Sequence, residues 1–197
     1  MATPHSPGRF VWHEMFTRDL EATKKFYSHL VGWKVKTENM GEMKYNMILA
    51  GETPIGGFMP LEMIKMPGVP PHWLGYVSVP NVKEAVAATE KAKGKVLVPA
   101  TSVSVGEFAV LQDPHGAVVA AWKAKDGDPP EVEKPASNTI CWDSIAVPDA
   151  EAAKAFYGQV FGWTAQAFGP ANFMLKRGTR DAASLDVVQK NVPPHWL

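Results

Sequence analysis

The chain contains one helical stretch twice, and this internal repeat limits the folds that it can adopt. Residues 19–33 and 149–163 both begin with Asp, carry a Phe-Tyr pair and end in Gly-Trp. Trp12 and Trp142 precede the two copies at the same distance, so a single shift of 130 positions (12 to 142, 33 to 163) aligns them. A repeat of this length defines the building block of the fold.

Each copy is predicted to be a strand followed by an amphipathic helix. Asp19 suits the N-cap of the first helix, and Gly32 supplies its end. Apolar and small residues recur between them at helical spacing and form one face: Leu20, Thr23, Phe26, Tyr27, Leu30 and Val31. Phe26 and Tyr27 are interpreted as core aromatics that hold the helix on a sheet.

The rest of the chain extends this pattern into modules of one strand, one helix and three strands. The first module covers residues 8–63, the second 72–124 and the third, which repeats the first, 138–189. A hairpin is expected in the second module across Asp-Pro-His-Gly at 113–116. Residues 193–197 repeat the Pro-Pro-His-Trp-Leu sequence that opens the second module. Three modules of an expected four are therefore predicted.

These modules give a predicted domain organisation. Residues 1–125 are expected to form one domain, residues 126–137 a polar, proline-rich linker, and residues 138–197 an incomplete second domain. Whether the chain is naturally a three-module protein or a part of a four-module one stays open at this point.

Composition excludes several classes of function. The 20 basic and 20 acidic residues cancel and form no basic run, which argues against nucleic acid as a partner. No window approaches the roughly 20 apolar residues of a membrane helix, and the polar lead-in at 1–8 shows no signal peptide. The single cysteine, Cys141, forms no internal disulfide and is interpreted as a small core residue. A soluble, cytoplasmic protein without membrane contact is expected.

The repeated modules, the Phe-Tyr pair before Gly-Trp and the Asp-Pro-X-Gly hairpin resemble the glyoxalase I, bleomycin-resistance and extradiol-dioxygenase group, the vicinal oxygen chelate superfamily. The resemblance is closest to tandem glyoxalase-like proteins. It implies an α+β fold in which βαβββ modules pair into an open, barrel-like cleft that holds the ligand. It also implies a divalent metal in that cleft, which polarises substrate oxygens as a Lewis acid.

The metal-ligand positions of this family can be placed residue by residue. In the second module they fall on Leu74 and Ala120, and in the first on Trp12 and on Gly56 or Gly57. None of these residues offers a side-chain lone pair suited to a divalent ion. The sequence therefore predicts no metal ligands and no cofactor.

Three histidines are the possible replacement ligands. His13 is expected on the opposite strand face from Trp12, His72 precedes its strand, and His115 lies in the hairpin turn. They lack the clustered spacing of a metal site, and surface or capping roles are predicted for them.

Strand alternation predicts which side chains line the cleft. They form an aromatic, mainly apolar set that suits a small-molecule ligand: Trp12, Phe16, Tyr45, Met47, Leu74, Tyr76 and Trp122. The alternative, that these aromatic residues simply fill the core, is equally compatible with the pattern.

Glu14 is the candidate catalytic residue, because it is a carboxylate on a strand predicted to face the apolar cleft. Desolvation there would disfavour its charged form and suit it to general acid or base work. The alternative is an ion pair with a nearby basic side chain. Ser144 occupies the matching position in the third module, so the two copies are not chemically equivalent.

Three functional hypotheses follow. The first is a glyoxalase-like protein that binds a small apolar or aromatic molecule without a metal. The second is a lyase, isomerase or dioxygenase, either with displaced metal ligands or using Glu14 without a metal. The third is a non-catalytic module that assembles with a second copy, because an unpaired third module would expose one face of its sheet. A homodimer is predicted.

Overall fold

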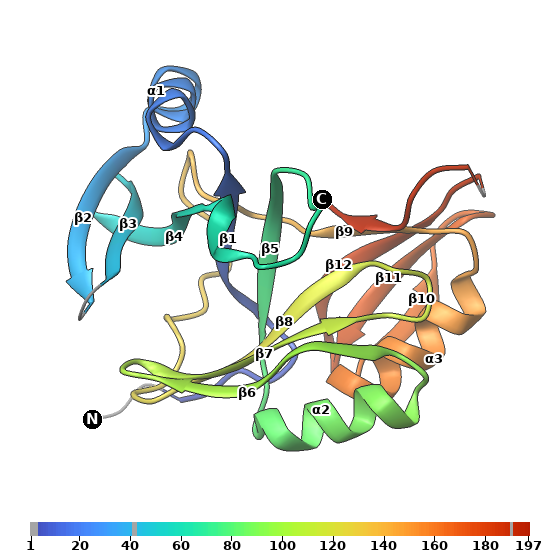
Figure 1. The fold of residues 1–197 in the computed structure, drawn as a ribbon. Helices are drawn as coiled ribbons and strands as arrows, with labels where there is room; N and C mark the ends of the chain where they lie inside the picture. Colours follow the sequence, from blue (N-terminus) through green and yellow to red (C-terminus); the bar gives the residue numbers. More distant parts are fainter. Residues whose placement is uncertain (1–3, 41–42, 190) are drawn as a thin grey trace. The chain divides into compact units, whose positions relative to one another are not determined.

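The computed structural model describes residues 4–40, 43–189 and 191–197, and its ribbon is drawn in Figure 1. The first module begins with a strand and a helix whose ends match the predicted caps. Asp19 accepts a hydrogen bond from the backbone N–H of Ala22, and Gly32 ends the helix with a positive φ of 71°. The elements of this module are β1 (Phe10–Thr17), α1 (Leu20–Val31), β2 (Lys34–Met40), β3 (Met43–Ala50), β4 (Thr53–Pro60) and a 3₁₀ helix (Leu61–Met63).

The second and third modules have the same order of elements. The second contains β5 (His72–Ser78), α2 (Val82–Lys91), β6 (Lys95–Val103), β7 (Gly106–Gln112) and β8 (Val118–Ala124). The third contains β9 (Ser144–Val147), α3 (Ala150–Phe161), β10 (Thr164–Ala167), β11 (Asn172–Arg177) and β12 (Arg180–Val187), and β13 (His195–Trp196) follows. In every module the first strand pairs in parallel with the last. The predicted α+β fold of βαβββ modules is confirmed.

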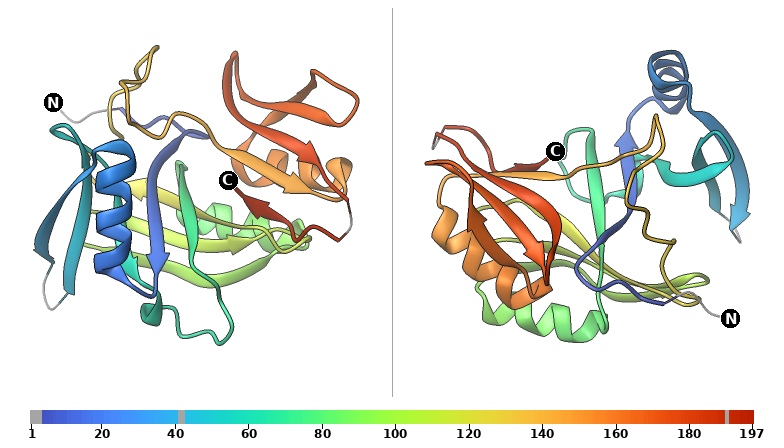
Figure 2. Two further views of the ribbon diagram at one scale, coloured as in Figure 1. Left: turned by 90° about the horizontal axis from the view of Figure 1, so that it is seen from above. Right: turned by 180° about the vertical axis from the view of Figure 1, so that it is seen from behind.

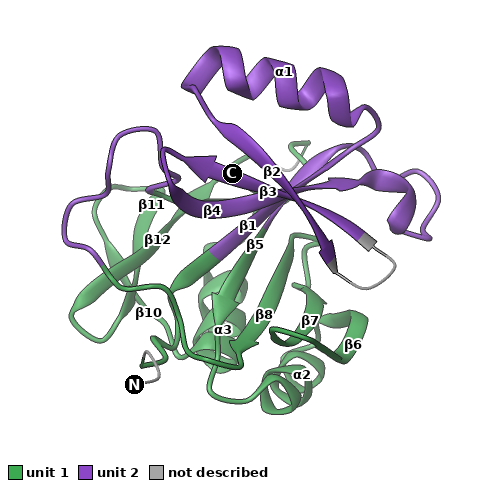
Figure 3. Cartoon of the chain, turned by 90° about the vertical axis from the view of Figure 1, so that its left-hand side faces the viewer, with its two compact units in different colours: residues 1–11, 75–131, 142–197 green, residues 12–74, 132–141 purple. Residues whose placement is uncertain are grey.

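Two compact units divide the chain, and Figure 3 colours them separately. Unit 1 consists of residues 1–11, 75–131 and 142–197, and unit 2 consists of residues 12–74 and 132–141. The second and third modules thus share unit 1, whereas most of the first module forms unit 2 with part of the linker. These compact units differ from the predicted domains, 1–125 and 138–197. The division into those two domains stays a prediction.

Unit 2 contains neighbouring strands in the order β2-β3-β4-β1, and α1 packs against them. Its core is formed by Trp33, Ile48 and Phe58. The Trp33 indole N–H donates a 2.6 Å hydrogen bond to the backbone carbonyl of Asn138. This bond ties the segment that begins at Asn138 to the end of the first helix.

Unit 1 contains two sheets, in the orders β5-β8-β7-β6 and β10-β11-β12-β9-β13. α2 and α3 lie side by side in this unit (Figures 1 and 2) and share a single core with the sheets. The Trp163 indole N–H donates a 2.8 Å hydrogen bond to the backbone carbonyl of Gly8. Gly8 and Asn138 are 130 positions apart, as are Trp33 and Trp163. The tryptophan that ends each copy of the repeat therefore binds the backbone that precedes the other copy.

Two expectations about the core are wrong. Phe26 is exposed, although its partner in the pair, Tyr27, stacks on Trp33 and Phe58. Cys141 is also exposed, and it lies just before β9, outside any strand. Among the described residues, no helix is both long and apolar enough to cross a membrane.

Candidate functional site

Three of the predicted site residues form a chain of hydrogen bonds within unit 2, here called the Trp12–Tyr45–Glu14 cluster. The Trp12 indole N–H donates to the Tyr45 hydroxyl oxygen at 2.8 Å. The Tyr45 hydroxyl in turn donates to Oε1 of Glu14 at 2.9 Å, and both of these residues are buried. Strand alternation correctly put Trp12 and Glu14 on one face of β1.

A glycine on the neighbouring strand makes room for this cluster. Gly57 of β4 lies opposite Glu14 of β1 in the parallel register and opposite Met47 of β3 in the antiparallel one. A Cβ atom at Gly57 would lie only 2.2 Å from the hydroxyl oxygen of Tyr45. The phenol ring therefore lies directly over the backbone of β4. A glycine inside a strand can mark such a close approach, but the sequence does not reveal which side chain makes it.

The electrostatics of the cluster favour a neutral phenol beside a carboxylate. Burial, and then the charge of Glu14, raise the pKa of Tyr45 far above its usual value. The phenol therefore keeps its proton and donates it in a hydrogen bond to Glu14. A hydrogen bond donated to a carboxylate stabilises the charged form and fixes its orientation. The cluster thus fixes the position of a buried carboxylate beside a neutral phenol.

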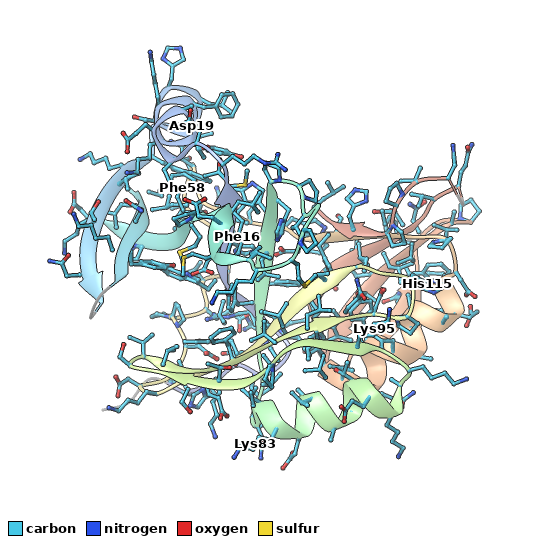
Figure 4. All side chains as sticks on the ribbon, in the orientation of Figure 1. Phe16, Asp19, Phe58, Lys83, Lys95 and His115 are labelled. Carbon is cyan, nitrogen blue, oxygen red and sulfur yellow. The ribbon has the colours of Figure 1, made fainter. Side chains whose placement is uncertain are left out.

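The remaining predicted residues of unit 2 lie on strands β1, β3 and β5. Phe16, which Figure 4 labels on β1, stacks on the His72 ring with centroids 5.3 Å apart. Met47 is half-buried opposite Gly57, and Leu74 is buried. His72 also makes a hydrogen bond through Nδ1 to the carbonyl of Pro70 at 2.8 Å, which fits the expected local role.

Two predicted residues belong to unit 1 and contact each other there. The Tyr76 and Trp122 rings meet edge to face with centroids 6.2 Å apart. Tyr76 of β5 pairs with Ala120 of β8, and Ala120 is completely buried. These two aromatic residues form a second group within unit 1.

The third module contains a related but different cluster. The Trp142 indole N–H donates to the Ser184 hydroxyl at 3.1 Å, and the Ser144 and Ser184 hydroxyl oxygens are 2.5 Å apart. Ser144 takes the place of Glu14, and Ser184 is its strand partner, as Gly57 is that of Glu14. The copy in unit 2 has a carboxylate where the copy in the third module has a hydroxyl, as the sequence comparison predicted.

Sequence reasoning missed a hollow in unit 1, at the N-terminus of α3. Its volume is about 730 Å³, and its lining includes His115, Asp149 and Phe173. Figure 4 labels His115 at the turn between β7 and β8. The His115 Nε2 atom is buried and has no hydrogen-bond partner among the described residues. The Asp-Pro-His-Gly turn was the signal in the sequence, but the turn alone does not reveal that α3 lies beside it.

The side chains that could donate to a metal ion are dispersed. Among the described residues, no group of three or more His, Cys, Asp or Glu side chains is placed to hold one. Glu14 is the carboxylate of the cluster, and its neighbours there are an indole and a phenol. By themselves these three side chains do not make a complete ligand set.

Comparison with known proteins identifies relatives over nearly the whole chain. CFP32 of Mycobacterium bovis, whose name assigns it provisionally as a glyoxylase, is 28% identical over 193 residues, which cover 94% of this chain and 74% of CFP32. The Mn(II)-bound glyoxalase from Novosphingobium aromaticivorans has a TM-score of 0.62 at 15% identity, over 94% of this chain and 62% of that one. BphC, a halotolerant catechol dioxygenase, has a TM-score of 0.58 at 12% identity, over 92% of this chain and 65% of the BphC chain. This chain thus spans under two thirds of each of these two solved structures.

The comparisons correct one prediction. The expectation that the protein has no metal cofactor is contradicted by the similarity to a Mn(II)-bound glyoxalase. The prediction was based on the family's usual ligand positions, here Trp12, Leu74 and Ala120. It did not follow from those positions that the protein binds no metal ion.

A family model also matches the first two modules. The model described as the Glyoxalase/Bleomycin resistance protein/Dioxygenase superfamily covers residues 9–120, which is more than half of the chain. The matched segment includes the Trp12–Tyr45–Glu14 cluster, the Phe-Tyr pair before Gly-Trp and the Asp-Pro-His-Gly hairpin. The chain belongs to the Glyoxalase/Bleomycin resistance protein/Dioxygenase superfamily.

Proposed function

We propose that this protein binds a small aromatic or apolar molecule at the Trp12–Tyr45–Glu14 cluster and that Glu14 exchanges a proton with it. The observation that supports this proposal most directly is the hydrogen-bond chain that ends on the Glu14 carboxylate. A flat ligand would stack on the half-buried Trp12 ring, with the half-buried Met47 adding apolar contact. The solved structure BphC is described as a catechol dioxygenase, and catechol is a small aromatic molecule of this kind.

The proposed chemistry uses the direction of the hydrogen bonds. Trp12 donates to the Tyr45 hydroxyl and Tyr45 donates to Glu14, so the carboxylate is the acceptor of the second of these two bonds. Because burial keeps the Tyr45 phenol protonated, it does not compete with Glu14 for a proton. Glu14 would act as general base by taking a proton from an acidic C–H or O–H group of the ligand. It would then act as general acid by giving that proton back to the ligand.

Ligand titration tests this proposal. We expect tryptophan emission to change in a saturable way when catechol and related small aromatics are added, and Trp12→Phe to remove that response. Glu14→Gln keeps the size of the side chain and should abolish any turnover found while binding persists. Trp142→Phe, at the counterpart position in the third module, is the matched control and should leave the response intact. The absence of a response to every aromatic tested, or unchanged turnover in Glu14→Gln, would contradict the proposal.

A metal-dependent enzyme of the same superfamily is the second candidate, and the similarity to a Mn(II)-bound glyoxalase favours it. Elemental analysis of the purified protein, followed by titration with Mn(II), distinguishes the two candidates. Stoichiometric metal whose affinity falls about tenfold or more in Glu14→Gln would support this candidate and assign Glu14 to the ion. Binding that is indifferent to Glu14→Gln would remove Glu14 from that role.

A further inference from the structure

A hollow of about 440 Å³ lies in unit 2, between α1 and the start of β2. It contains none of the residues of the Trp12–Tyr45–Glu14 cluster, so it is a separate feature of the unit. Its volume falls within the range of small-molecule sites, which is about 300–1,000 Å³. The residues that line it come from one helix and the segment that follows it: Glu21, Lys24, Lys25, Ser28, Trp33, Lys34 and Val35.

Helical spacing brings the polar residues of α1 together at this hollow. Four of them stand at positions i, i+3, i+4 and i+7, which lie on one face of a helix: Glu21, Lys24, Lys25 and Ser28. Lys34 lines the hollow from the first position of β2. Three lysines from two elements therefore surround the same space.

The core of unit 2 supplies the base of the hollow. Trp33 is buried in that core, and Val35 packs against it. The Trp33 ring stacks on Tyr27 with centroids 5.1 Å apart, and its indole N–H is bonded to the backbone of Asn138. The base is thus held in place by the fold itself, which lowers the cost of ordering the site when a ligand binds.

The lining carries an excess of positive charge, although the whole chain has a formal charge of zero. Three lysines and one glutamate give the lining a formal charge of +2. Glu21 offsets Lys24, with 2.9 Å between Oε1 and Nζ. Lys34 lies 3.9 Å from Glu52, but the two side chains are 70% and 95% exposed, so this pair contributes little. Lys25 has no ion-pair partner among the described residues, and the hollow therefore suits an anion.

The other copy of the repeat shows that these lysines are not needed to build the fold. Three lining residues are replaced there, at the same shift of 130 positions: Lys25, Ser28 and Lys34 by Ala155, Gly158 and Thr164. The helix α3 and the strand β10 form without them. The ion pair is kept, because Lys154 contacts Glu151, so the equivalent residues of the third module have a formal charge of zero. Lys25 and Lys34 thus add charge that neither the helix nor the strand requires.

We propose that this hollow binds a small soluble molecule through its phosphate groups. Lysine ammonium groups act as point charges toward phosphate oxygens, and the Ser28 hydroxyl is a further hydrogen-bond donor in the lining. A formal charge of +2 matches an anion with at least two negative charges. The ligand is different from the aromatic molecule proposed above, and its binding does not use Glu14.

Titration of the whole chain with inorganic pyrophosphate, which has two phosphate groups, tests the proposal. Backbone amide resonances are followed by NMR at constant ionic strength. We expect saturable shifts for residues 21–35, and weaker binding of inorganic phosphate, because the hollow has room for more than one phosphate group. Chloride at the same ionic strength is the control for general screening and should produce no saturable shift.

Substitutions taken from the third module give the variant. Lys25→Ala combined with Lys34→Thr should bind pyrophosphate about tenfold more weakly or worse, because two charges are removed. Both lysines are exposed, so this variant should stay folded. Lys36→Thr is the matched control, because Lys36 is an exposed lysine of the same strand that lies outside the lining, 2.8 Å from Glu38. It should keep the original affinity.

Four results would overturn the proposal. The first is the absence of saturable shifts at residues 21–35, and the second is their reproduction by chloride. The third is an affinity for inorganic phosphate as high as that for pyrophosphate. The fourth is a loss of affinity in the double variant no larger than that in Lys36→Thr.

Discussion

Tyr45 uses its hydroxyl group twice, as acceptor for Trp12 and as donor to Glu14. Removing that oxygen would leave an indole N–H and a carboxylate without this partner in a mostly buried environment. A buried polar group that loses its hydrogen bond costs more than the bond itself contributes. The Tyr45 hydroxyl is therefore expected to contribute to the stability of unit 2.

Tyr45→Phe is expected to lower the free energy of unfolding by about 1–3 kcal/mol, because it removes two buried hydrogen bonds. Urea denaturation measures the change. Tyr27→Phe is the control, since the half-buried Tyr27 hydroxyl only accepts one hydrogen bond, from Trp73, among the contacts described. A loss in Tyr45→Phe no larger than that in Tyr27→Phe would show that the cluster is not a stabilising element.

The pH dependence of Tyr45 follows from the raised pKa of its phenol. The unfolded chain releases this proton near pH 10, whereas the folded chain keeps it, so the folded state binds more protons above that pH. Stability is therefore fully present below about pH 10 and falls as the pH rises further. Tyr157, whose pKa is also raised by burial, should behave in the same way.

Ultraviolet absorbance of phenolate during an alkaline titration checks this expectation. Tyr45 and Tyr157 should ionise only together with unfolding, so Tyr45→Phe should leave the early, folded-state part of the absorbance change unaltered. An early amplitude that decreases in Tyr45→Phe would contradict the burial of its hydroxyl.

At the scale of single residues, the sequence allowed the shared face of Trp12 and Glu14 to be predicted, because alternation along a strand is a local property. It did not reveal that Tyr45 connects them, because this depends on the register of three strands and on the missing Cβ of Gly57. The metal prediction failed for a related reason. The ligand positions were placed by their spacing along the sequence. A metal ion is bound by groups that come together in the folded protein, whatever their spacing in the sequence.

The elements themselves were predicted with more success, because their ends depend on local chemistry. Asp19 and Asp149 cap their helices through the same side-chain oxygen, and Gly32 and Gly162 end them with φ values of 71° and 72°. The hairpin at Asp-Pro-His-Gly was predicted for the same reason. Its further role, as a support for α3, depends on a contact across 44 positions and could not be predicted.

Asp113 is expected to be the most sensitive residue of this hairpin. Its Oδ1 accepts hydrogen bonds from the backbone N–H groups of His115, Gly116 and Ala117, and its Oδ2 accepts from Tyr157. Asp113→Ala removes all four and should lower the free energy of unfolding by about 3 kcal/mol or more. Asp113→Asn retains an oxygen for the turn and should cost less. Equal losses in the two variants, measured by urea denaturation, would mean that the turn bonds contribute little.

At the scale of the whole molecule, the two copies of one helix have different surroundings. The repeat predicted that both would be amphipathic, and both are. It could not predict that Phe156 is in a core and Phe26 in solvent, because burial depends on which modules meet.

Truncating these equivalent residues should therefore have opposite outcomes. Phe156→Ala is expected to cost about 3–5 kcal/mol through the cavity that it leaves. Phe26→Ala is expected to stay within about 0.5 kcal/mol of the original chain, as exposed substitutions usually do. Thermal or urea unfolding of both variants checks this, and similar losses would show that the α1 face is already covered in solution.

The reciprocal bonds of Trp33 and Trp163 also bear on the order in which the chain can fold during synthesis. Trp33 needs a carbonyl that follows 105 positions later, and the Gly8 carbonyl accepts from an indole that follows 155 positions later. The first module therefore leaves the ribosome before either contact can form. Closing loops of this length carries an entropic cost that precedes the gain from the contact. The first module therefore lacks these two hydrogen bonds until most of the chain has been translated.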